Sequence, residues 1–174
     1  GLLHMLFEDF QKGTTADSAA KLEVQITQQL RNGSALELQV FLTFLRFNRS
    51  VVKTNFFKVH KAAVAFRLDP TVFMPSLDAP RIPYGVFLIL GSQFRGFHIR
   101  FTDIARGGIR MILSHTLHAY QRNKLMLFAE NYNLALAQLL KNKDIPEGGS
   151  KGTILVSPRA TYDRKALFLQ YIDA

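Results

Sequence analysis

A glycine-rich turn between a helical segment and an apolar strand constrains this chain most. Residues 141–152 read KNKDIPEGGSKG, with three glycines and a proline. Apolar residues recur at helical spacing before this turn, over residues 121–140, and a short apolar run follows it at residues 153–156. Glycine lets the backbone adopt positive φ angles and lets other groups approach closely. The pattern predicts a tight connection from a helix into a strand, in the style of an α/β protein.

The first third of the chain has helical spacing, whereas the rest mixes strands with helices. Helices are expected at residues 2–11, 16–31 and 34–53, the last starting at a capping box from Ser34 to Glu37. Strands are expected at residues 62–68, 84–90, 97–101 and 153–156, and further helices at residues 121–140 and 164–172. Within residues 97–101, the alternation places His98 and Arg100 on the face opposite Ile99.

The fold class that follows is α/β. We expect a helical segment over residues 1–60 and a mixed α/β domain over residues 61–174. Pro70, Pro75, Pro80 and Pro83 mark a proline-rich linker, and residues 111–119 are expected to form a loop.

Composition narrows the possible chemistry. The chain lacks cysteine, which excludes disulfides, thiol catalysis and cysteine-based metal sites. The longest fully apolar runs, such as residues 86–90, are far too short to span a membrane. His115 and His118 lack the carboxylate pattern of a zinc site, so no metal ligands are predicted. The net charge of +9 suits nucleic acid, an anionic membrane surface or small anionic substrates.

Two glycine turns present the cations of most interest. Arg106 and Arg110 flank one turn, and Lys141 and Lys151 lie in or beside the other. If the fold brings the turns together, these four cations would converge and suit a substrate with two carboxylates. A lysine crowded by positive charge also loses its proton more readily, which suits proton transfer. The alternative, an ordinary surface turn with solvated lysines, stays open on residue types alone.

Familiar nucleotide-binding patterns are absent from the sequence. No G-x-G-x-x-G occurs, and residues 148–152 do not have the glycine–lysine spacing of a P-loop. No cofactor-binding residue is therefore predicted in this chain. The basic residues are scattered, yet a basic module that binds RNA or another anion remains an alternative, as does an assembly role for the helices of residues 16–53.

Three stretches together resemble a known family. They are FRGFHIRF at residues 94–101, ARGGIR at residues 105–110 and the turn at residues 141–152. They are similar to the N-terminal catalytic segment of NAD-specific glutamate dehydrogenases of the large-subunit eukaryotic type, within the Glu/Leu/Phe/Val dehydrogenase superfamily. The resemblance covers residues 62–158 and departs at Thr153, where glycine or valine is usual.

The resemblance implies an oxidoreductase that deaminates L-glutamate to 2-oxoglutarate and ammonia with NAD. Lys151 would be the catalytic lysine, and Lys141 would bind the α-carboxylate. Arg106 falls where small-subunit relatives have a lysine for the side-chain carboxylate, and Arg110 falls on their neighbouring arginine; both would bind substrate. Residues 61–174 would then form the substrate-binding domain.

Further expectations come from the same resemblance. Gly148 and Gly149 would shape the lysine-bearing turn. The catalytic aspartate and the Rossmann domain that binds NAD would lie downstream of Ala174, so the chain would be a fragment that neither binds NAD tightly nor turns over alone. The complete enzyme would be an intracellular homo-oligomer, mitochondrial or cytoplasmic, acting on a dicarboxylate rather than on nucleic acid or a membrane.

Overall fold

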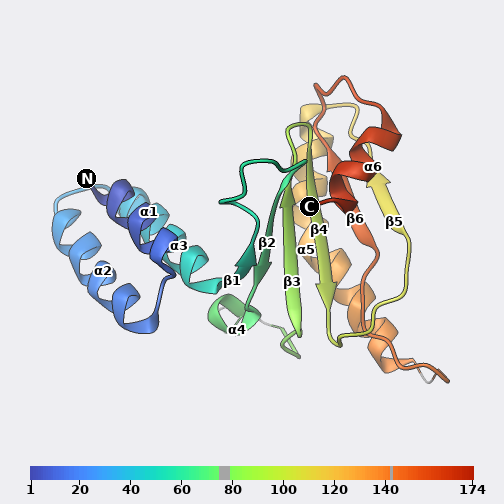
Figure 1. The fold of residues 1–174 in the computed structure, drawn as a ribbon, viewed down its shortest axis with the longest axis horizontal. Helices are drawn as coiled ribbons and strands as arrows, with labels where there is room; N and C mark the ends of the chain where they lie inside the picture. Colours follow the sequence, from blue (N-terminus) through green and yellow to red (C-terminus); the bar gives the residue numbers. More distant parts are fainter. Residues whose placement is uncertain (75–78, 142) are drawn as a thin grey trace. The chain divides into compact units, whose positions relative to one another are not determined.

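The computed structural model describes residues 1–74, 79–141 and 143–174 (Figure 1). Its backbone forms two compact units: Gly1–Val51 with Thr71–Ala79, here the helical unit, and Val52–Pro70 with Pro80–Ala174, here the sheet unit. Pro75 of the expected linker and Asn142 of the glycine-rich turn lie outside the described residues. Among the described residues, no helix combines the length and apolarity needed to cross a membrane.

The helical unit packs three helices around their apolar faces: α1 (Leu2–Lys12), α2 (Ala16–Gln29) and α3 (Ala35–Ser50). Buried Leu6 and Ile26 contribute to the shared core. The Ser34 side chain accepts the Glu37 amide as expected, whereas a reciprocal capping box forms at Thr15 and Ser18, which the sequence analysis did not single out.

The expectation that the third helix continues to residue 53 is wrong. The helix ends at Ser50, and β1 (Val51–Thr54) follows directly. Val51 and Val52 are β-branched and favour a strand, and Thr54 Oγ1 donates a hydrogen bond of 2.7 Å to the carbonyl of Ala65. Pairing with a neighbouring strand therefore overrides the helical spacing of the sequence.

One sheet of six strands forms the centre of the sheet unit, in the order β1-β2-β3-β4-β6-β5. The remaining strands are β2 (Val64–Leu68), β3 (Gly85–Leu90), β4 (Phe94–Arg100), β5 (Ile109–Ile112) and β6 (Gly152–Val156). Strands β2, β3, β4 and β6 pair antiparallel, while β5 runs parallel to β6. The residues of β5 were expected to belong to a turn and a loop, and this expectation is wrong. They form a strand by pairing with β6, which lies about forty residues later in the chain.

Helices cover both faces of this sheet. Figure 1 shows α5 (Leu117–Leu140) behind the strands and α6 (Arg164–Ile172) in front of them. On the α5 side, the ring of Phe97 lies 6.1 Å from that of Phe128. On the α6 side, Gly96 leaves room for the Tyr171 ring, because a Cβ there would lie 2.8 Å from it. All five residues of β6 are buried, which explains their continuous apolar pattern.

The short helix α4 (Pro70–Phe73) and the start of α5 refine the predicted boundaries. Pro70, which was assigned to a loop, is the first residue of α4, where a proline is tolerated. Helix α5 begins at Leu117 rather than near residue 121, because the Thr116 side chain caps it by accepting the amide of Ala119 at 3.1 Å.

Candidate functional site

Backbone hydrogen bonds join the two glycine turns of the sequence. We call residues 101–108 the arginine turn and residues 143–151 the lysine turn. The Gly148 amide donates to the carbonyl of Ile104 at 3.2 Å, and directly after the lysine turn the Gly152 amide donates to that of Gly108, also at 3.2 Å. The fold therefore brings the two turns, about forty positions apart in the sequence, together at one end of β4, β5 and β6.

Close approach, rather than unusual backbone angles, explains the glycines of the lysine turn. A Cβ on Gly149 would lie only 2.4 Å from the Cβ of Ala105. A Cβ on Gly148 would lie 3.1 Å from the Cβ of Phe101. Neither has a positive φ, since Gly13 is the only glycine with one among the described residues. These glycines let the two turns touch.

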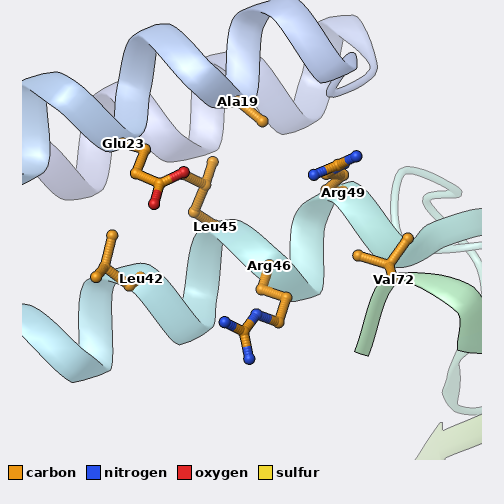
Figure 2. A pocket seen from close by; sticks show the side chains of 7 residues that line it. All are labelled: Ala19, Glu23, Leu42, Leu45, Arg46, Arg49 and Val72. Atoms are coloured by element: carbon orange, nitrogen blue, oxygen red, sulfur yellow. The ribbon is translucent and has the colours of Figure 1, made fainter. Parts of the chain in front are cut away.

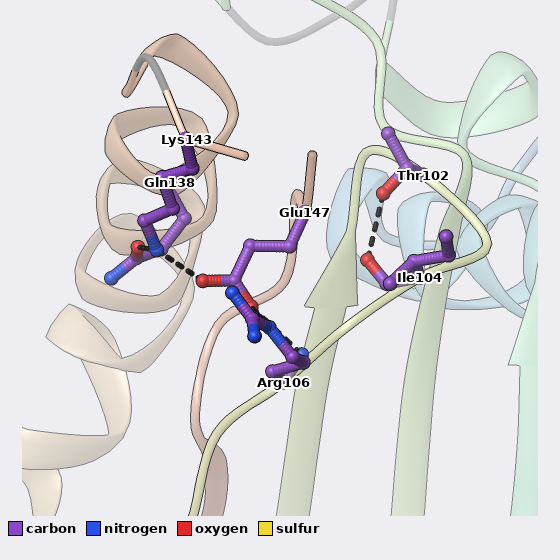
Figure 3. Close-up of polar contacts among 6 residues, drawn as sticks. All are labelled: Thr102, Ile104, Arg106, Gln138, Lys143 and Glu147. Carbon is purple, nitrogen blue, oxygen red and sulfur yellow. Dashed lines mark hydrogen bonds and ion pairs between the residues drawn. The ribbon is translucent and has the colours of Figure 1, made fainter. Parts of the chain in front are cut away.

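A buried carboxylate, Glu147, binds both turns (Figure 3). Its Oε2 accepts the Arg106 amide at 3.1 Å and the Arg106 Nε at 3.2 Å. Its Oε1 accepts a hydrogen bond from Lys143 Nζ, which also donates to Gln138 Oε1 at 2.7 Å. The hydrogen bond from Lys143, and then that from Arg106, lower the pKa of Glu147 against the opposing effect of burial. Glu147 is therefore an ionised acceptor at neutral pH.

The predicted cations do not form a single cluster without carboxylate partners. Arg106 pairs with Glu147, and Arg110 Nη2 pairs with Glu130 Oε2 of α5 at 2.5 Å. Lys141 and Lys151 are exposed and have no carboxylate partner among the residues that the structure describes. A Cβ on Gly107 would lie 3.9 Å from Lys151 Cγ, so the Lys151 side chain runs beside the arginine turn. The fold thus brings Arg106 and Lys151 onto two turns in direct contact.

His98 and Ser150 connect β4 to the lysine turn. His98 Nε2 accepts a hydrogen bond of 2.9 Å from Arg100 Nε, and its Nδ1 lies 3.2 Å from Ser150 Oγ. Burial and the adjacent Arg100 charge lower the pKa of His98 to about 4, although a hydrogen bond to the Lys151 backbone opposes this shift. Since Arg100 can only donate, the imidazole is neutral with its proton on Nδ1.

The sequence alone did not predict a role for Glu147 or His98. The alternation over residues 97–101 did place His98 and Arg100 on the correct face, as their contacts with the Phe87 ring confirm. An acidic residue among glycines and cations was the available signal for Glu147. Its burial and its two partners depend on contacts that only the folded chain forms.

Several hollows lie in the described part of the chain. One of about 190 Å³ lies along the two turns and is lined by His98, Arg100 and Arg106, among others, but not by Lys151. A larger one of about 600 Å³ lies over β2, β3 and β4, with Arg67 and Arg100 in its wall. A third of about 320 Å³ belongs to the helical unit, is drawn in Figure 2, and contains none of the predicted site residues. Its lining residues are Ala19, Glu23, Leu42, Leu45, Arg46, Arg49 and Val72.

The lysine turn does not have the form of a Rossmann phosphate-binding turn. A Rossmann cradle runs from a strand through a glycine turn into a helix, whereas the lysine turn runs from α5 into β6, the reverse order. No group of three histidine, aspartate or glutamate side chains within the described ranges could hold a metal ion. The site offers exposed cations, which suit an anionic substrate, and one buried carboxylate that holds Arg106 and Lys143.

Comparison with known proteins agrees with this chemistry. Residues 25–174 match the family described as bacterial NAD-glutamate dehydrogenase, catalytic domain. The chain is 45% identical to glutamate dehydrogenase 2 of Dictyostelium discoideum, over 99% of this chain and 17% of that protein. It is 49% identical to the NAD-specific glutamate dehydrogenase of Neurospora crassa, over 90% of this chain and 15% of that protein. It is 44% identical to the NAD-specific glutamate dehydrogenase of Saccharomyces cerevisiae, over 97% of this chain and 16% of that protein. The chain thus spans about a sixth of these relatives. On this match and these identities, it belongs to the NAD-glutamate dehydrogenase catalytic-domain family.

Proposed function

We propose that this chain is the substrate-binding part of an NAD-dependent glutamate dehydrogenase, which deaminates L-glutamate oxidatively to 2-oxoglutarate and ammonia. The observation that carries the proposal is the hydrogen-bonded pairing of the arginine and lysine turns. It sets Arg106 beside the turn that holds Lys151. Family membership and the names of the relatives in Neurospora crassa and Saccharomyces cerevisiae support the reaction and its cofactor.

The residue roles follow from charge and exposure. The exposed Lys151 would polarise the water or amino group during deamination, as a compact cation with three donors can. Lys141 would bind the α-carboxylate, while Arg106 and Arg110 would bind the side-chain carboxylate. Gly148 and Gly149 would hold the lysine turn against the arginine turn. NAD would supply the hydride acceptor, and we propose that its Rossmann domain and the catalytic aspartate lie outside this chain.

Steady-state kinetics of the full-length enzyme test these roles. We expect Lys151→Ala to abolish NADH production from glutamate, and Lys141→Ala or Arg106→Ala mainly to raise KM. Lys124→Ala is a matched control, because Lys124 is another exposed lysine of the sheet unit and has no proposed role. Full kcat in Lys151→Ala would refute its assignment, and glutamate turnover by the 174-residue chain alone would refute the downstream location of the NAD site.

Assembly and compartment extend the same proposal. We propose a homo-oligomer that works in glutamate catabolism, in mitochondria or the cytoplasm. Sedimentation of the full-length protein tests assembly, and a monomer at micromolar concentration would contradict it. Fractionation of cells that express the protein from its own gene tests the compartment.

A further inference from the structure

We infer that Glu147 is a positioning residue that orients Arg106 toward the substrate's side-chain carboxylate and so sets the preference for a dicarboxylate. The inference rests on the proposed function of the site. Glu147 would not touch the substrate itself; it would act through Arg106.

One carboxylate oxygen fixes Arg106 at two points. Glu147 Oε2 accepts both the main-chain amide and the side-chain Nε of Arg106. The Arg106 side chain therefore points in a fixed direction, and the inner edge of its guanidinium, at Nε, is occupied by Glu147. Its two Nη groups remain, and these form the edge that binds a carboxylate bidentately.

Exposure agrees with this division of the guanidinium. The Arg106 side chain is 53% exposed, whereas that of Glu147 is only 6% exposed. An incoming anion can therefore reach the outer edge of Arg106 but cannot easily replace Glu147 at the inner edge. Thr102 Oγ1 also donates to the carbonyl of Ile104 at 2.8 Å, which helps to shape the chain just before Arg106 (Figure 3).

Lys143 anchors the other side of the carboxylate. Its Nζ donates to Glu147 Oε1 and to Gln138 Oε1 of α5, so two of its three donors are committed. The side chain is only 28% exposed, which favours a structural partner rather than a substrate ligand. Two cations on one carboxylate leave a net positive charge, and the exposed part of that charge lies on Arg106.

Substrate selectivity in the full-length enzyme tests the inference. L-glutamate is compared with L-norvaline, which has the α-carboxylate but no side-chain carboxylate. Glu147→Gln keeps the volume but turns one acceptor oxygen into a donor facing Lys143 or Arg106. We expect KM for glutamate to rise about tenfold or more, with kcat/KM for norvaline within about twofold of wild type.

Controls separate positioning from a general structural role. Asp144→Asn makes the same charge change in the same turn, at an exposed residue, and we expect it to leave both substrates unchanged. In an Arg106→Ala background, Glu147→Gln should cause no further loss of glutamate selectivity, because the two residues act as one unit. If Glu147→Gln does not fold, Glu147→Asp replaces it, since a shorter carboxylate keeps the charge but cannot span both cations.

The outcomes are distinct. Equal losses for glutamate and norvaline, unchanged glutamate KM, or a lower glutamate KM would each overturn the inference. The last result would mean that Glu147 competes with substrate for Arg106. If the wild-type enzyme does not oxidise glutamate, the proposed function fails instead.

Discussion

Gly149→Ala should push the arginine and lysine turns apart. The added Cβ would lie 2.4 Å from the Cβ of Ala105 and 3.2 Å from its Cα. Ordinary carbon contacts need about 3.5–4.0 Å, so the turns must separate by about 1 Å or more. Ala105 has no side-chain torsion that could relieve the contact, and therefore the backbone must move.

The cost follows from this backbone displacement. Overpacking of a well-packed site costs about 1–3 kcal/mol, and each kcal/mol lowers Tm by about 2–4 °C in a chain of this length. We therefore expect Tm of the 174-residue chain to fall by roughly 2–12 °C. Circular dichroism during heating measures this shift.

Gly108→Ala in the neighbouring turn is the matched control. A Cβ there meets nothing within 4 Å, and the backbone does not have positive φ. Its Tm should stay level or rise slightly, because alanine restricts the unfolded chain. If Gly149→Ala melts within about 1 °C of wild type while Gly108→Ala behaves as expected, the two turns are not in contact, and the site built upon them is wrong.

Three further predictions concern buried or half-buried polar groups. Thr153→Val removes the donor to buried Asn131 Oδ1 and should cost about 1–3 kcal/mol in urea unfolding. Adding Asn131→Leu should recover most of this loss. The pKa of His98 is 6.5 in the unfolded chain and about 4 in the folded chain, so between these pH values the folded chain binds fewer protons. Up to roughly 3 kcal/mol of stability is therefore lost as pH falls through this window. His98→Gln should make the stability depend less on pH. Burial raises the pKa of Tyr171 to about 12, so Tyr171→Phe should remove a late-ionising phenol from the absorbance titration; an unchanged titration curve would contradict it.

Hydrophobic spacing was sufficient for most of the elements. The residues of α6 match the expected helix, and β3 and β6 begin within one residue of the expected strands. The spacing was insufficient at β5, where four residues after a glycine pair become a strand only through parallel pairing with β6. It was also insufficient at β1, where sheet pairing determines the end of α3.

The candidate site shows the same division between local and long-range information. The glycines and lysines were enough to identify the turn around Lys151 from the sequence. The roles proposed for its residues came from the family resemblance. The partners of those residues could not be predicted, because Glu147 reaches Arg106 across forty-one positions and Arg110 meets Glu130 across twenty. Such contacts depend on how β5, α5 and β6 pack, and no local pattern encodes them.

The two arginines should respond differently when an anionic substrate binds. The pair of Arg110 with Glu130 has side chains 49% and 44% exposed, and exposed pairs contribute only about 0–1 kcal/mol. Glu130 can therefore release Arg110 to a substrate carboxylate at little cost. Arg106 is held through its backbone as well as its side chain by a buried carboxylate, so it should keep that partner and use its outer edge. Glu130→Gln should accordingly leave glutamate KM level or lower it, whereas Glu147→Gln should raise it; this difference follows from the burial of Glu147 and from its bond to the Arg106 backbone.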